Sequence, residues 1–297
     1  MRGLSSQELP EILAQIAGEE ERAGSEPPER TSRDVARLMG RLGPALAVSA
    51  RRAGAAAVAS GRWLADVIVD AAPRLPVRDL ATLQAHHRGL EGEALADALV
   101  RNAMLTTTAI GAGGGALSTA KWFLPGTLVT VPLQLAVETA AVAAVEIKLV
   151  GELHEAYGIP VVGTPTQRGT AYALAWANRR GVNPLEPATM STAFGLMARQ
   201  RVQRRLLGSA GRGLGALTPM MVGAVYAARI NRRQTQILAD ALRNDLRRQR
   251  PLTGGLAGRV VTKMLAGPAT ATAPAAALPA APQPTPARPR RRLLRRR

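Results

Sequence analysis

The sequence predicts an all-α protein: a multi-helix bundle with a central apolar, Gly/Ala-rich helical hairpin and a disordered C-terminal tail. Apolar residues recur at the three- and four-residue spacing of helices, and no segment alternates as a half-buried strand does. Residues 102–147 carry only three charges, Lys121, Glu138 and Glu146, so this block must be buried. Seven prolines follow residue 266, which is typical of a disordered segment.

Residues 1–30 are predicted to form a flexible acidic arm that contains a short amphipathic helix. Seven glutamates against three arginines give this segment a net charge of −4. Ser5 and Glu8 have the spacing of a capping box, and four apolar side chains between Leu9 and Ile16 share one helical face.

A helical domain is expected over residues 31–265, and a Pro/Ala-rich linker with an arginine-rich tail over residues 266–297. Gly43-Pro44 should break or kink the first helix of the domain, and an alanine-rich helix should then continue to Ile68. Later helices are expected over residues 79–87, 91–104, 133–157, 170–180, 191–207 and 213–245.

The helix at 133–157 has the clearest ends, because Pro132 suits a first turn and Gly158 suits the left-handed position after a last turn. Projected at 100° per residue, its charged side chains Glu138, Lys148, Glu152 and Glu155 share one sector. Glu146 and His154 fall among apolar positions instead. We therefore single out three candidate functional polar residues: Glu138, Glu146 and His154.

A glycine cluster precedes this helix. Residues 111–116 satisfy the dinucleotide pattern G-x-G-x-x-[GA], but Pro125-Gly126 and Pro132 interrupt the helix that the pattern requires. Gly111 and Gly115 also form a small-xxx-small pair, which lets helices approach closely. We favour helix packing for Gly111 and Gly115 and expect no cofactor.

No catalytic or metal-binding pattern is complete. The chain has no cysteine, and its HExxH-like stretch from His154 has glycine at position 158 in place of the second histidine. We expect no metal and no catalytic residues. An enzyme with Glu146 and His154 as acid–base partners is a third hypothesis; they would lie about 12 Å apart along the helix axis, so another helix would have to complete the site.

Charge separates the two leading functional hypotheses. The net charge of +18 fits an anionic membrane surface or a nucleic acid, although part of the arginine excess is what a GC-rich genome produces. A central carboxylate costs about 2.5–3.5 kcal/mol in a spanning helix, so Glu138 makes simple spanning of the apolar block marginal. The tail arginines predicted to bind an anionic surface are Arg288, Arg290, Arg291, Arg292, Arg295, Arg296 and Arg297.

The order of these features resembles the EcsC family of bacterial membrane-associated proteins, and also a group of uncharacterised helical proteins from high-GC actinobacteria. The resemblance covers roughly residues 60–245. It is carried by the glycine-rich apolar segment, the Pro-Gly break, the helix ending at residues 149–158, and residues 223–225 leading to Asn231 and Thr235. It implies a helical fold and accessory work beside a membrane transporter, and it supplies no catalytic residues.

We therefore expect a membrane-associated accessory or scaffold protein, peripheral or partly inserted on the cytoplasmic side of the cell membrane. The N-terminus lacks the basic and apolar regions of a secretory signal. An anionic membrane surface is the expected partner, and a membrane protein is a second. The alternative is a soluble helical nucleic-acid-binding protein that uses the basic runs at 199–206 and 288–297.

Overall fold

Helices make up all the regular structure in the residues that the computed structural model describes, which are 8–120, 130–180 and 218–254. The all-α prediction is confirmed for these residues. The elements are α1 (Glu8–Ala23), α2 (Pro28–Ala53), α3 (Ala55–Ala59), α4 (Arg62–Ala71), the short 3-10 helix η1 (Ala72–Arg74), α5 (Leu80–His86), α6 (Gly92–Ala120), α7 (Thr130–Ala156), α8 (Pro165–Arg179) and α10 (Thr218–Gly254).

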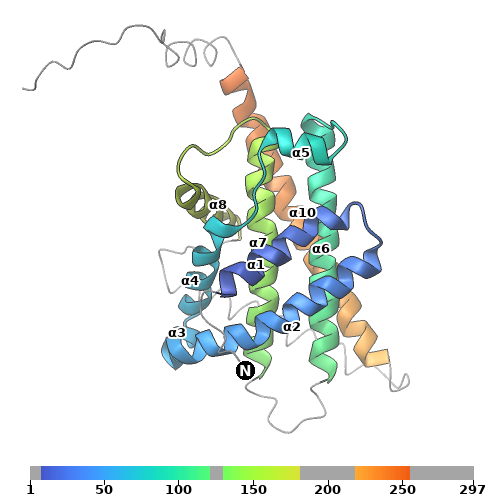
Figure 1. Cartoon of the computed structure of the whole chain (residues 1–297), viewed down its shortest axis with the longest axis vertical. Coiled ribbons are helices and arrows are strands. Elements are labelled where there is room, and N and C mark those ends of the chain that lie inside the picture. The colour runs from blue at the N-terminus through green and yellow to red at the C-terminus, as the bar shows by residue number, and fades with distance from the viewer. Residues whose placement is uncertain (1–7, 121–129, 181–217, 255–297) are drawn as a thin grey trace, which may run out of the picture. The chain divides into compact units, whose positions relative to one another are not determined.

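The predicted central hairpin consists of α6 and α7, which pack as antiparallel neighbours (Figure 1). Helix α7 is buried on nearly all sides, since α1, α2, α4, α5, α6 and α8 all pack against it. Its run of Ala140, Ala141, Ala143 and Ala144 lets neighbouring helices approach closely. As the sequence predicts, α7 ends just before Gly158, which has a left-handed φ of 70°.

Helix α10 lies along this hairpin, parallel to α7 and antiparallel to α6. At one end of α6, Glu93 bonds Arg243 and Arg247. Farther along α6, Thr107 bonds Thr235, and Gly111 lies against the backbone of Ala227 and Ala228. The residue numbers therefore rise along α6 as they fall along α10. It follows that the C-terminal end of α6 and the N-terminal ends of α7 and α10 lie at the same end of the bundle.

The short amphipathic helix predicted in the N-terminal arm is confirmed for residues 8–23, although it packs in the core and not in a flexible arm. These residues form α1, a 16-residue helix that packs against α2, α4, α6 and α7. Its apolar face, Leu9, Ile12, Leu13 and Ile16, is at most 4% exposed. Burial of this face holds the helix in the core, although the local composition is acidic. Ser5 lies outside the described residues, and with it the predicted capping box.

Of the two outcomes predicted for Gly43-Pro44, a break does not occur, because α2 continues through Pro44 to Ala53. A proline inside a helix costs about 3 kcal/mol, but Leu42, Ala45 and Leu46 beside it are buried in the core and offset this cost. The chain breaks instead at Gly54 and Gly61, whose φ angles are 86° and 72°.

A compact unit of the chain ends at Thr253, and it holds all the helices above except for the last residue of α10. The predicted division at residue 266 lies outside the described residues. The predicted disordered tail lies outside the described residues, and so does the helix expected at 191–207. Among the described residues, no helix is both long and apolar enough to cross a membrane.

Gly111, one of the two glycines predicted to pack helices together, lies close to the backbone of α10. A Cβ built on Gly111 would lie 2.7 Å from the backbone nitrogen of Ala228 and 2.8 Å from the carbonyl of Ala227. Backbone atoms of a helix cannot move aside as a flexible side chain can. Gly115 also lies in α6, but its packing is outside the described part of the structure.

We expect Gly111→Ala to lower the free energy of unfolding by about 1–3 kcal/mol, because its methyl group would force α6 and α10 apart. Chemical denaturation followed by circular dichroism measures this. Gly40→Ala in α2 is the control, since a Cβ there meets nothing within 4 Å, and it should be neutral or stabilising by up to about 1 kcal/mol. Equal stability of the Gly111→Ala variant and the unchanged protein would contradict the contact.

Candidate functional site: charges buried around α7

Four charged side chains of α7 are almost fully removed from solvent. Glu138 is 2% exposed, Glu146 0%, Lys148 1% and Glu152 0%. Ionisable side chains are rarely buried to this degree unless they are paired, because desolvation strongly disfavours a lone charge. They form two clusters on different sides of α7, which we call the Lys148 cluster and the Glu146 cluster.

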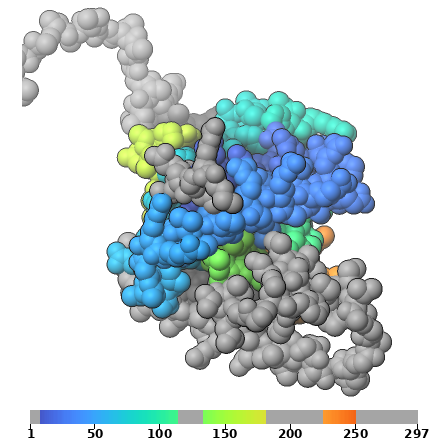
Figure 2. All heavy atoms as spheres, turned by 60° about the horizontal axis from the view of Figure 1, so that its bottom comes forward, coloured from blue at the N-terminus to red at the C-terminus, as the bar shows by residue number. Residues whose placement is uncertain are grey.

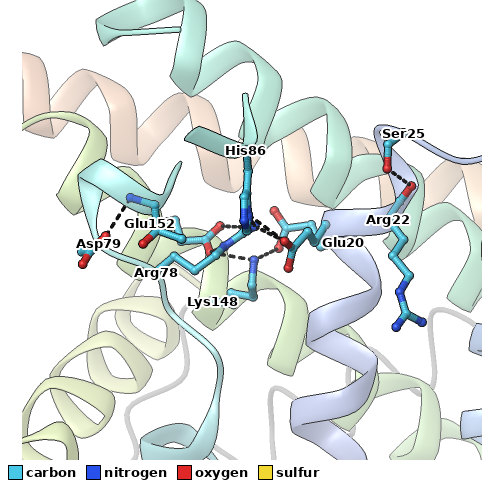
Figure 3. A network of polar contacts seen from close by, with 10 residues as sticks. Glu20, Arg22, Ser25, Arg78, Asp79, His86, Lys148 and Glu152 are labelled. Carbon is cyan, nitrogen blue, oxygen red and sulfur yellow. Dashed lines mark hydrogen bonds and ion pairs between the residues drawn. The ribbon is translucent and has the colours of Figure 1, made fainter. Parts of the chain in front are cut away.

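The Lys148 cluster joins three parts of the chain (Figure 3). The ammonium nitrogen of Lys148 lies 3.1 Å from Glu20 Oε2 on α1 and 2.7 Å from Glu152 Oε1 on α7 itself. Arg78 approaches Glu152 from the segment before α5, with Nε 2.9 Å from Oε1 and Nη2 3.3 Å from Oε2. One lysine and one arginine therefore share the Glu152 carboxylate.

The start of α5 positions the arginine of this cluster. Asp79, the next residue, caps α5 by accepting a hydrogen bond from the Thr82 N–H at 2.8 Å. Arg78 Nη1 then reaches Glu21 Oε1 at 3.3 Å, and His86 Nδ1 lies 2.6 Å from the same oxygen. Glu21 and His86 are partly exposed, so this side of the cluster faces solvent.

The Glu20 carboxyl is the group in this cluster most sensitive to protonation. Burial raises the pKa of Glu20, the nearby Lys148 ammonium lowers it, and the negative charge of Glu152 raises it, and the net result is a pKa of about 7. Its Oε1 has no hydrogen-bond partner among the described residues. When Glu20 is protonated, Lys148 and Arg78 remain balanced by Glu152 and Glu21.

The Glu146 cluster joins α7 to α8 and α10. Glu146 Oε2 accepts hydrogen bonds from Trp176 Nε1 at 2.8 Å and from Arg180 Nε at 3.0 Å. Its Oε1 accepts from Thr235 Oγ1 at 2.8 Å and from Arg180 Nη2. The arginine thus binds the carboxylate in a two-pronged geometry, and both oxygens are fully used.

A line of buried polar groups continues from this cluster to Glu138. Thr235 Oγ1 also bonds Thr107 Oγ1 on α6 at 3.1 Å. The side-chain amide of Asn231, one turn away on α10, donates to Glu138 Oε1 at 3.0 Å and to the Thr107 carbonyl at 3.4 Å. Glu138 and Glu146 therefore belong to one connected set of contacts among α6, α7, α8 and α10.

The structure does not bring Glu146 and His154 together. His154 Nδ1 donates to the carbonyl of Val150 at 2.7 Å, and its ring lies 5.6 Å from that of Tyr172. Burial lowers the pKa of His154 below its ordinary value of 6.5, so the neutral ring is favoured. Each of the two residues has its own partners, and no hydrogen bond between them is present in the described structure.

The Lys148 cluster and the Glu146 cluster hold α7 in position against its neighbouring helices. The buried carboxylates are bonded to lysine, arginine, tryptophan, threonine or asparagine, which leaves Glu146 no acceptor site for a substrate proton. Within the described ranges, no group of three or more His, Asp or Glu side chains could hold a metal ion. The predicted anionic-surface arginines at 288–297 and the basic run at 199–206 lie outside the described residues.

Sequence reasoning missed Glu20 and Arg78. Glu20 lies four residues after Ile16, so it continues the apolar face of α1, and this spacing is a signal that a carboxylate enters the core. Arg78 carries no comparable signal. The one local sequence feature beside Arg78 is the helix-capping residue Asp79, and a helix cap does not indicate that Arg78 contacts α7.

Comparisons of the chain with models of protein families, with curated proteins and with solved structures found no match.

The raised pKa of Glu20 gives stability a definite pH dependence. Between about pH 4.5 and pH 7 the folded protein retains a proton on Glu20 that the unfolded chain has released. The contribution of Glu20 to the free energy of unfolding therefore falls as the pH rises through this window. We expect Glu20→Gln, measured by urea denaturation at about pH 5 and about pH 7.5, to remove this part of the pH dependence. Glu11→Gln, on the exposed face of α1, is the matched control, and an identical pH dependence in both variants would contradict the assignment.

Glu146→Gln should destabilise the protein by about 3 kcal/mol, because it leaves the partly buried Arg180 guanidinium without its counter-ion. Urea denaturation with detection of tryptophan fluorescence measures the loss, since Trp176 bonds the same carboxylate. The control is Asp245→Asn, which removes the more exposed ion pair with Arg179 and should cost less than about 1 kcal/mol. Similar losses in the two variants would show that the Glu146 cluster is no stronger than a surface pair.

Proposed function

We propose that this protein is a membrane-associated helical accessory or scaffold protein, held at the cytoplasmic face, that supports a membrane complex or transporter. One observation carries the proposal: three uncharged helix ends lie together at one end of the bundle. They are residues 102–120 of α6, 130–137 of α7 and 218–228 of α10. In Figure 1 this is the lower end of the bundle.

The length of these ends fits one leaflet of a bilayer. Beyond the level of Thr107, Glu138 and Asn231, the three helices continue for about 12–20 Å at 1.5 Å per residue. Half of a hydrocarbon core about 30 Å thick is about 15 Å. In this arrangement Glu138 and its partner Asn231 lie just outside the uncharged residues of α7 and α10, so that Glu138 stays out of the hydrocarbon region. The free-energy cost of placing a carboxylate in hydrocarbon, which makes simple spanning by the apolar block marginal, is thereby avoided.

Exposed apolar side chains on α10 support the same orientation. Val225 is 60% exposed and Tyr226 is 40% exposed, and both lie in the turn of α10 that borders the uncharged end. A tyrosine at this depth would sit at the headgroup level, where its apolar ring and polar hydroxyl are both accommodated. The resemblance to the EcsC family adds a membrane transporter as the kind of partner, and the arginines at 288–297 would add electrostatic attachment.

The test is flotation of the full chain with vesicles of phosphatidylcholine that contain about one third phosphatidylglycerol. We expect Val225→Glu to reduce vesicle binding by roughly fivefold, because a charge close to the headgroup level costs about 1 kcal/mol, less than the cost of about 2.5–3.5 kcal/mol at the bilayer centre. Ile237→Glu is the matched control. Ile237 is 52% exposed on the same helix but lies about 18 Å farther from the uncharged end, so its substitution should leave binding unchanged.

Two results would overturn the proposal. One is a full chain that does not float with vesicles and remains entirely soluble after cell lysis and low-salt washing. The other is vesicle binding that Val225→Glu and Ile237→Glu reduce equally, since the position of the uncharged end would then be irrelevant. Circular dichroism of both variants checks that each is folded.

A further inference from the structure

Six exposed arginines lie beside the uncharged end, and the proposed function does not use them. Three are on α2, at positions 33, 37 and 41, and three are on α10, at positions 229, 232 and 233. We call Arg33, Arg37, Arg41, Arg229, Arg232 and Arg233 the arginine collar. None of the six is paired with a carboxylate among the described residues. Arg41 donates a hydrogen bond to the neutral Gln15 side chain at 3.3 Å.

The α10 half of the collar begins where the uncharged run stops. Arg229 directly follows Ala228, whose backbone touches Gly111, and Arg232 and Arg233 lie one turn farther on. Along α10, no acidic residue occurs before Asp240. These three arginines therefore form a purely basic segment at the border between the uncharged end and the rest of the bundle.

The α2 half lies at the same level on the other side of α6. The Cβ position of Gly113 lies 3.7 Å from Met39 Sδ and 3.8 Å from Ala36 Cβ, while that of Gly111 faces α10. Two residues correspond to about 200° around a helix, so α2 and α10 pack on opposite sides of α6. Gly43 of α2 lies near Val137 of α7, one residue before Glu138. Helix α2 thus crosses α6 at Gly113, within its uncharged residues, and crosses α7 at Val137, where the uncharged residues of α7 end.

The three arginines of α2 point away from the core. At 100° per residue they fall within an arc of about 80°, opposite the buried side chains of Val35, Leu38 and Leu42. The only acid in residues 31–53 is Asp34. In Figure 2 the molecule is turned so that the bottom of Figure 1 comes forward, and α2, in blue, lies at the surface in this view.

Some acidic side chains do pair with arginines near the opposite end of the bundle. Glu93 and Asp97, near the start of α6, bind Arg243, and Glu93 also binds Arg247. The six collar arginines have no carboxylate partner among the described residues, so their positive charge is available to an anionic surface.

We propose that the arginine collar binds the headgroups of anionic phospholipids around the uncharged end. This proposal rests on the proposed function, and it adds the lipid class and the residues that select it. Arginine side chains are long enough to reach phosphate oxygens while their stems stay on apolar surface, and guanidinium groups bind phosphate with two hydrogen bonds. Each basic residue near an anionic surface raises the partition coefficient about fivefold, and the effect fades within about 10 Å.

The test compares two full-length double variants that lose the same charge from the same helix. Arg232→Gln/Arg233→Gln lies in the collar, and Arg247→Gln/Arg248→Gln lies about 22 Å farther along α10. We expect the collar variant to bind vesicles with about one third phosphatidylglycerol roughly 10- to 30-fold more weakly, and the control variant to bind nearly as well as the unchanged protein. With phosphatidylcholine alone, the collar variant and the unchanged protein should bind equally.

Equal losses in both double variants would overturn the proposal, because the effect would then reflect net charge and not the collar. Equal binding of the unchanged protein to neutral and anionic vesicles would also overturn it, while leaving the proposed membrane association intact. The proposed function itself fails when neither vesicle is bound, or when Val225→Glu and Ile237→Glu reduce vesicle binding equally. Binding of duplex DNA that is lost in the collar variant, with vesicle binding unaffected, would assign these arginines to a nucleic acid instead.

Discussion

Lys148 is the residue on which the arrangement of the N-terminal half depends. Its ammonium group is 1% exposed and lies between two buried carboxylates, Glu20 and Glu152, so all three groups lose their hydration together. Removal of Lys148 would cost about 3–5 kcal/mol, because it would leave a buried carboxylate without its counter-ion. A one-turn slip of α1 along α7 would have the same effect. The cluster therefore selects a single register for α1, α7 and the segment before α5.

The same reasoning explains why α7 can be charged and central at once. A helix surrounded by other helices has no solvent face, so each of its ionic side chains needs a partner from a neighbour. The two clusters assign these partners to different helices: α1 and the α5 segment on one side, α8 and α10 on the other. Charge on α7 thus specifies which helix lies where, while the alanines and Gly111 provide the close approach.

Charge also gives the bundle two unlike ends. At one end Glu93 and Asp97 neutralise arginines of α10, and at the other three helices finish without charge between rows of unpaired arginine. A lipid interface presents this same order, with hydrocarbon first and anionic groups next to it. The proposed membrane association and the proposed role of the arginine collar both follow from this order of charges.

The sequence by itself determined the all-α class, the central hairpin and the C-terminal end of α7, since helical periodicity and the glycine after a last turn are local properties. It did not reveal that α1 belongs to the core or that α2 continues through Pro44, because burial against distant helices outweighs acidic composition and the cost of proline. Only the tertiary structure decided the partners of the buried charges. Glu20 and Lys148 are 128 residues apart, and no local spacing determines a contact between helices so far apart in the chain.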